Sequence, residues 1–170
     1  DKNIDYFFNF AAPNPRLNES DLAQITRNIL VRQALILEVL SNHNVKKVIN
    51  VGSIWQYSDT GEYRDSDCLY VNFKNAVTEL TKAYGSSFTT AELVLFDTIG
   101  PDDSRGKVLN QLYKSALENS TIKMSTGSQI MYPMDVRDCV SAILWVAFKM
   151  KYSGYKKFWL PGPERLSLRA

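Results

Sequence analysis

Apolar runs typical of buried strands alternate with long segments of helical periodicity, and this alternation limits the folds open to the chain. The runs Ile4–Ala11, Val45–Val51 and Thr89–Phe96 are apolar enough to lie inside a sheet. Between them, residues 19–41 and 69–84 repeat apolar side chains at helical spacing. Strands that alternate with long helices predict βαβ units, and therefore a parallel sheet with helices on both faces.

The pattern becomes less regular after residue 96. We expect helices over 108–117 and 135–150, a short extended segment at 122–124, irregular structure at 131–134 and a last short strand at 158–160. The segment 97–107 contains Gly, Pro and several Asp residues, which is typical of a loop. This change of pattern predicts a smaller, substrate-facing lobe.

Composition excludes several classes of protein. A formal net charge of +2 on 170 residues gives no basic surface of the kind that nucleic-acid binders need. The longest apolar stretch, 140–148, is far shorter than the roughly 20 residues that cross a bilayer. Cys68 and Cys139 lack metal-ligand spacing and are interpreted as small buried hydrophobes, which favours a cytoplasmic protein. His43, the only histidine, is expected to end a helix, and we expect no metal site.

Three residues could together assist the reduction of a carbonyl group, given a separate hydride donor. Ser53 follows a predicted strand, where α/β folds present their chemistry. Tyr70 and Lys74 lie four residues apart near the start of a predicted helix, so their side chains share one face. A nearby ammonium lowers the pKa of a phenol, which can then exchange a proton with a carbonyl oxygen while the serine holds that oxygen. A Tyr-x-x-x-Lys pair alone also occurs by chance; the order strand, Ser, loop, Tyr and Lys makes it informative.

Several segments, in one order, resemble a known family. They are "FNFAA", "VKKVINVGSIWQYS", "LYVNFKNAVTELTKAY", "LVLFDTIGPDDSRGK", "STGSQIMYPMDVRDCVSAIL" and "FWLPGPERLSLRA". Together they resemble the extended short-chain dehydrogenases/reductases, the NAD-dependent epimerase/dehydratase family, over nearly the whole chain. Within that family they look most like sugar-nucleotide 4-keto reductases of the CDP-abequose or CDP-paratose synthase kind. The resemblance implies a Rossmann-like catalytic part over 1–96 and a mixed substrate-binding part over 97–170, in a single compact unit.

The resemblance also implies catalytic roles for Ser53, Tyr70 and Lys74. Ser53 would orient the C4 oxygen of the sugar, Tyr70 would be the acid/base, and Lys74 would lower the pKa of Tyr70 and hold the nicotinamide ribose. The cofactor would be NADP or NAD, with NADPH slightly preferred. The substrate would be a nucleotide-sugar, and a homodimer would form through the helices near 22–40 and 70–84.

Further site residues follow from the same resemblance. Ala11 and Ala12 would line the path of the cofactor, and Asp97 and Thr98 would face the sugar or the cofactor. Arg105 would contact a phosphate or the nucleotide, because guanidinium suits phosphate geometry; a solvent-facing arginine is an equal alternative. Trp55 is expected to be a core or loop anchor.

The sequence departs from the family pattern at two places that bear on function. No glycine-rich turn precedes Ile4, so the fold is expected to be N-terminally truncated and the chain a fragment. Ile54 and Trp55 follow Ser53 where dehydratases of the family carry an acidic pair, which disfavours dehydration. Reduction of a 4-keto group is the leading hypothesis. The alternatives are a sugar-nucleotide epimerase of the same family, and a non-catalytic binding module or inactive truncated relative.

Overall fold

The computed structural model describes residues 4–13, 19–101, 103 and 106–169, and they divide into two compact units. The first unit is formed by Asp1–Leu95 and Ile143–Trp159, and the second by Phe96–Ala142 and Leu160–Ala170. The predicted catalytic residues Ser53, Tyr70 and Lys74 all belong to the first unit. The two units are therefore described separately.

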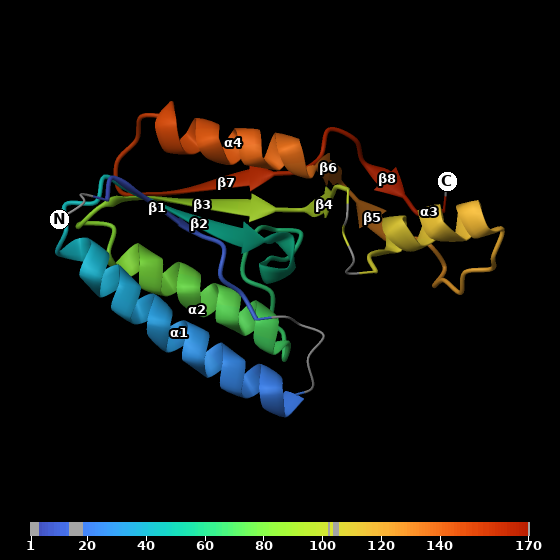
Figure 1. The fold of residues 1–170 in the computed structure, drawn as a ribbon, viewed down its shortest axis with the longest axis horizontal. Helices are drawn as coiled ribbons and strands as arrows, with labels where there is room; N and C mark the ends of the chain where they lie inside the picture. The colour runs from blue at the N-terminus through green and yellow to red at the C-terminus, as the bar shows by residue number, and fades with distance from the viewer. Residues whose placement is uncertain (1–3, 14–18, 102, 104–105, 170) are drawn as a thin grey trace. The chain divides into compact units, whose positions relative to one another are not determined.

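A four-stranded sheet forms the centre of the first unit (Figure 1). Its strands, in spatial order, are β1 (Tyr6–Asn9), β2 (Lys47–Ser53), β3 (Thr89–Leu95) and β7 (Tyr155–Leu160). The first three pair in parallel, with Asn9 opposite Asn50 and Ser53 opposite Leu95. Parallel pairing places the carboxyl ends of these strands at one edge of the sheet, where α/β folds bind ligands.

Helices cover both faces of this sheet. Helices α1 (Glu19–Ser41) and α2 (Leu69–Ala83) lie together on one face, and the C-terminal half of α4 (Val136–Phe148) lies on the other (Figure 1). The core beneath α1 and α2 contains buried apolar side chains of α1, of β2 and the segment leading into it, and of the turn before β3: Leu37, Leu40, Val45, Val48 and Phe88. The predicted Rossmann-like arrangement of a parallel sheet between helices is confirmed.

The C-terminal end of α4 is held on the sheet by a buried lysine. Lys47 of β2 donates from Nζ to the backbone oxygens of Val146, Ala147 and Met150, over 2.7–3.0 Å. A cation at this end of a helix satisfies carbonyl groups that lack helical partners and matches the sign of the helix dipole. The first two apolar residues of the strand, Val48 and Ile49, are buried beside it.

The second unit is built from short elements. It contains α3 (Val108–Glu118), a parallel pair of β4 (Asp97–Ile99) with β6 (Pro133–Asp135), and an antiparallel pair of β5 (Ile130–Met131) with β8 (Leu166–Ser167). The predictions of a loop at 97–99 and of irregular structure at 131–134 were therefore wrong, and residues 122–124, predicted to be extended, belong to no strand. Pairings of two or three residues leave no periodicity in the sequence, so only tertiary structure reveals them.

Several local predictions can be compared with the structure. The helix predicted over 19–41 has those bounds, and Cys139 is buried as expected. Cys68 is exposed, so its interpretation as a buried hydrophobe was wrong; it stands at the start of α2 and its side chain does not enter the core. Within the described part of the chain, no helix has the length and apolar character needed to cross a membrane. The same residues contain no cluster of His, Cys, Asp or Glu suited to a metal ion.

Candidate active site

Ser53 is the last residue of β2 and is fixed by the turn that follows it. Its backbone is extended, and the short helical turn η1 (Ile54–Gln56) begins directly after it. The Ser53 hydroxyl accepts a hydrogen bond from the backbone N–H of Trp55 at 3.3 Å, and the Ser53 N–H donates to Oε1 of Gln56 at 2.8 Å. This reciprocal capping holds the serine at the carboxyl edge of the sheet.

Tyr70 lies in the first turn of α2 and is half-buried. The ring of Trp55 meets the ring of Tyr70 edge to face, with 6.0 Å between their centroids. Trp55 therefore contacts two of the three predicted catalytic residues: its backbone N–H donates to the Ser53 hydroxyl, and its ring packs on Tyr70. Of the predicted core or loop anchor, the core part was wrong, because 55% of Trp55 is exposed; the residue lies in the turn after β2 with its ring against Tyr70.

Lys74 follows Tyr70 by one helical turn and is almost completely buried, with 4% of its surface exposed. Its ammonium donates to the backbone oxygen of Val51 at 2.7 Å, two residues before Ser53 on the same strand. Burial lowers the pKa of Lys74 from 10.5 to about 8, and the carboxylate of Glu92 partly opposes that shift. The lysine is therefore still mostly protonated at pH 7 and loses its proton near pH 8.

The two predicted cofactor-lining alanines follow β1 after one intervening residue, Phe10. The Ala11 N–H donates to Oδ1 of Asn9 at 3.1 Å, and both Ala11 and Ala12 are partly exposed. Asn9 is itself bonded to Asn50 of β2 and to Gln33 of α1, at 3.0 and 2.9 Å. Because β1 and β2 are parallel neighbours, these alanines lie at the sheet edge that carries Ser53.

The other predicted site residues belong to the second unit or lie outside the described residues. Oδ2 of Asp97 accepts from the backbone N–H of Tyr132 at 2.8 Å. Lys107 donates to the backbone oxygen and the hydroxyl of Thr98, at 2.6 and 3.2 Å. These contacts give both residues a structural role within their unit, and their contact with a ligand stays a prediction. Arg105 lies outside the described residues.

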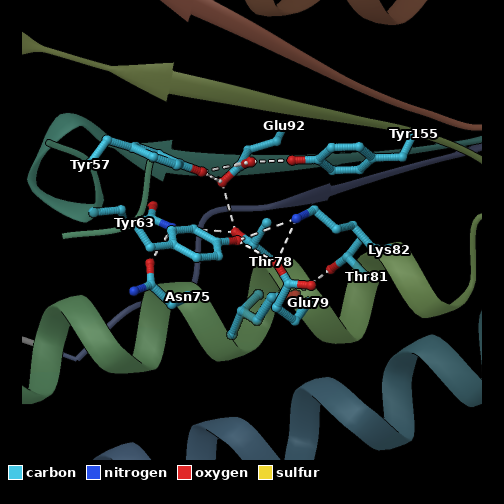
Figure 2. A network of polar contacts seen from close by, with 11 residues as sticks. Tyr57, Tyr63, Asn75, Thr78, Glu79, Thr81, Lys82, Glu92 and Tyr155 are labelled. Carbon is cyan, nitrogen blue, oxygen red and sulfur yellow. Dashed lines mark hydrogen bonds and ion pairs between the residues drawn. The ribbon is translucent and has the colours of Figure 1, made fainter. Parts of the chain in front are cut away.

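Sequence reasoning missed a buried carboxylate on the strand next to Ser53. Glu92 of β3 has no exposed surface and accepts hydrogen bonds from Tyr57, Thr78 and Tyr155 (Figure 2). Burial, together with the Glu92 charge, raises the pKa of both tyrosines, so their hydroxyls stay protonated and donate. The signal in the sequence was a glutamate inside the apolar run "TTAELVLF". Charged residues are rarely buried without a partner.

Comparison with known proteins supports the resemblance drawn from the sequence. The model of a family described as the NAD dependent epimerase/dehydratase family matches residues 1–156. Among curated proteins, CDP-abequose synthase of Yersinia pseudotuberculosis is 29% identical over 127 residues, which is 74% of this chain and 44% of that protein. The chain thus spans less than half the length of the curated relative it matches.

Solved structures share the fold. MoeE5 in complex with UDP-glucuronic acid and NAD superposes with a TM-score of 0.80 at 18% identity, over 98% of this chain and 60% of its own. A UDP-glucuronic acid 4-epimerase from Bacillus cereus in complex with NAD superposes with a TM-score of 0.84 at 18% identity, over 97% of this chain and 56% of its own. At such identities the likeness concerns the fold.

Proposed function

Because the chain belongs to the NAD dependent epimerase/dehydratase family, we propose that it forms the catalytic part of an enzyme that reduces the 4-keto group of a nucleotide-diphosphate deoxysugar. The observation that supports this most is the convergence of Ser53, Tyr70 and Lys74 at the end of β2. Trp55 joins the first two, and Lys74 bonds to the strand that carries the serine.

In this proposal the Tyr70 hydroxyl gives its proton to the C4 oxygen as that oxygen becomes an alkoxide. The Ser53 hydroxyl donates a hydrogen bond to the same oxygen while negative charge develops on it. The Lys74 ammonium stabilises the phenolate that remains on Tyr70, because an opposite charge favours the ionised phenol. When bound, NADPH or NADH would supply the hydride for C4. The product is the C4 alcohol, so protons and electrons balance.

The residues at this edge of the sheet suit a dinucleotide. Ala11 and Ala12 have side chains short enough for a flat ligand to approach the backbone after β1. Lys74 uses one donor on Val51, and an ammonium has three, so donors remain for ribose hydroxyls. We propose NADP or NAD as the cofactor; the solved neighbours cited above were determined with NAD.

The nucleotide-sugar class of substrate rests on the similarity to CDP-abequose synthase and on the UDP-sugar bound in MoeE5. Dehydration is disfavoured because Ile54 and Trp55, which follow Ser53, carry no acid for an elimination. Epimerisation at C4 is the second candidate, since the Bacillus cereus neighbour is a 4-epimerase and the same three residues could serve it.

The test uses the longest natural polypeptide that contains this sequence. With a nucleotide-diphosphate 4-keto-deoxysugar and NADPH or NADH, reduction consumes reduced cofactor in proportion to product, whereas epimerisation consumes none. Tyr70→Phe should lower kcat by a factor of about 10² or more. Tyr113→Phe, an exposed tyrosine on α3, is the matched control and should retain activity. Full activity of Tyr70→Phe would exclude this assignment, and binding of sugar nucleotides without turnover would favour a non-catalytic module.

We further infer that a second copy of the chain packs on α1, as the predicted homodimer requires. Val31, Leu35 and Val39 are each more than half exposed and recur every four residues along one face of that helix. Leu35→Glu should convert the dimer to a monomer in sedimentation analysis, and Gln24→Glu on the same helix should not. A monomeric wild type would contradict the inference.

A further inference from the structure

The buried carboxylate of Glu92 lies where three elements of the first unit meet. Glu92 belongs to β3, and its oxygens accept from Thr78 of α2 at 2.7 Å and from Tyr57, in the segment after β2, at 3.0 Å. Tyr155 of β7 donates to the second oxygen. A buried charge is costly unless it is fully hydrogen-bonded, and these hydroxyls meet that cost.

A continuous series of hydrogen bonds leads from Ser53 to this carboxylate. The Ser53 N–H donates to Oε1 of Gln56 at 2.8 Å. Nε2 of Gln56 donates to the hydroxyl of Thr78 at 3.3 Å and to Oδ1 of Asn75 at 3.2 Å. The Thr78 hydroxyl then donates to Oε1 of Glu92 at 2.7 Å. We call the Ser53 backbone, Gln56, Thr78 and Glu92 the Glu92 network.

Every donor in the Glu92 network points toward the carboxylate, which is the acceptor at which the series ends. Glu92 can only accept, so the Thr78 hydroxyl must donate to it and is left to accept from Gln56. The amide of Gln56 turns its oxygen to the Ser53 N–H, which can only donate, and its nitrogen to Thr78 and to Oδ1 of Asn75. Both ends of the series therefore require the same orientation, and each bond polarises the next.

The backbone beside Ser53 is shaped to fit the same network. A Cβ placed on Gly52 would lie 2.8 Å from Oε1 of Glu92 and 3.0 Å from Oε1 of Gln56, both of which are buried. Tyr70, Lys74 and Thr78 recur every four residues on α2, so one helical stripe carries the proposed acid/base, its lysine and the bridging hydroxyl. The network and the proposed site thus share strand β2 and helix α2.

We propose that Glu92 is a positioning residue, whose carboxylate acts through Thr78 and Gln56 to hold the backbone at Ser53 and so aims the serine hydroxyl at the substrate's carbonyl oxygen. The inference rests on the proposed function for its catalytic consequence. If Glu92 served folding alone, removing the Thr78 hydroxyl would affect turnover no more than removing any other buried hydroxyl of α2. In the positioning role, removing the Thr78 hydroxyl lowers turnover specifically, because this hydroxyl links Glu92 to Gln56.

The structure supplies a matched pair of threonines for the test. Thr78 and Thr81 are both buried on α2, but Thr81 donates to the backbone oxygen of Val77 within its own helix. Thr78→Val should lower kcat about 10-fold with KM changed less than twofold, because a misdirected donor is lost mainly in the transition state. Thr81→Val should keep the wild-type kcat, and Thr78→Ser, which restores the hydroxyl, should recover it.

Glu92→Gln tests the charge at nearly constant volume. It should lower kcat to a similar extent, and the Thr78→Val, Glu92→Gln double variant should be no slower than the slower single variant, because both changes interrupt one series. Hydrogen exchange of the Ser53 N–H, followed by NMR in the same polypeptide, gives a readout that needs no substrate. Exchange should be at least about 10-fold faster in Thr78→Val than in Thr81→Val.

The outcomes separate the two proposals. If Thr78→Val leaves both kcat and the Ser53 exchange rate at the values of Thr81→Val, the positioning role of Glu92 is refuted, even if Glu92→Gln fails to fold. If the wild type turns over no sugar nucleotide, the proposed function fails; faster Ser53 exchange in Thr78→Val would then still support the positional link, and unchanged exchange would refute it.

Discussion

Replacing Lys74 by methionine should make the protein more stable. Lys74 is 4% exposed and its pKa falls from 10.5 to about 8 on folding. At pH 7 this shift costs about 3 kcal/mol of folding free energy, since each pKa unit corresponds to roughly 1.4 kcal/mol. Methionine fills a similar volume and carries no charge. It loses the hydrogen bond to Val51, worth about 1 kcal/mol, so the net gain should be about 2 kcal/mol.

The sign of the effect can be checked through pH. The folded-state pKa of Lys74 lies below the unfolded one, so between about pH 8 and 10.5 the unfolded state binds more protons, and the stability of the wild type rises with pH. At pH 9 most folded molecules already hold neutral lysine. The advantage of Lys74→Met should therefore shrink to about 1 kcal/mol.

Urea denaturation at pH 7 and pH 9 measures both quantities, with unchanged m-values as the condition for comparison. Lys151→Met, at an exposed lysine, is the control and should change stability by less than about 0.5 kcal/mol at either pH. A Lys74→Met variant less stable than the wild type at pH 7, or an advantage that does not decrease by pH 9, would refute the assignment of a desolvated ammonium.

Three further predictions concern the first unit. Turnover should fall as pH rises through the pKa of Lys74, near 8. In Glu92→Gln the fall should begin at lower pH, because the carboxylate of Glu92 favours the charged form of Lys74. Coincident pH profiles of the two proteins would contradict this. Lys47→Met should destabilise the fold by about 2 kcal/mol in urea, because three backbone oxygens at the end of α4 lose their donor. Gly52→Ala should lower the free energy of unfolding in urea by about 1–3 kcal/mol, because the added methyl group crowds two buried side chains. Gly154→Ala has open space but a φ of +63°, so it should lower the free energy of unfolding by about 1–2 kcal/mol through backbone strain. A Gly52→Ala variant as stable as one with alanine at an exposed helix position would exclude the crowding.

The sequence predicted the elements of the first unit well because each has a long periodic or continuously apolar pattern. The helix over 19–41 follows from the spacing of its apolar residues, and the strand that begins at Thr89 follows from a continuous apolar run. The position of Ser53 at the end of β2 followed from the apolar run before it. In the second unit, β5 and β8 have two residues each and pair across more than thirty positions, which no local pattern encodes.

The sequence predicted the candidate catalytic residues but not the buried polar residues that are hydrogen-bonded in series to the backbone of Ser53. Ser53, Tyr70 and Lys74 stand out because their chemistry and order are informative. Gln56 and Thr78 belong to residue types that are common on surfaces, and only the fold shows that they are buried and bonded in series. Glu92 gave a signal as an acid inside an apolar strand, but nothing in the sequence says which hydroxyls it accepts from.

The first unit places two opposite charges on the same face of its sheet. Lys74 and Glu92 are both buried, and each would be costly alone. The carboxylate raises the pKa of the lysine against the effect of burial, so the ammonium keeps its proton near neutral pH, where the proposed chemistry needs it. Apolar residues at both positions would give a more stable sheet and helix, but neither a charge beside Tyr70 nor an acceptor to orient the turn after Ser53. The polar interior therefore agrees with the chemistry proposed at the end of β2.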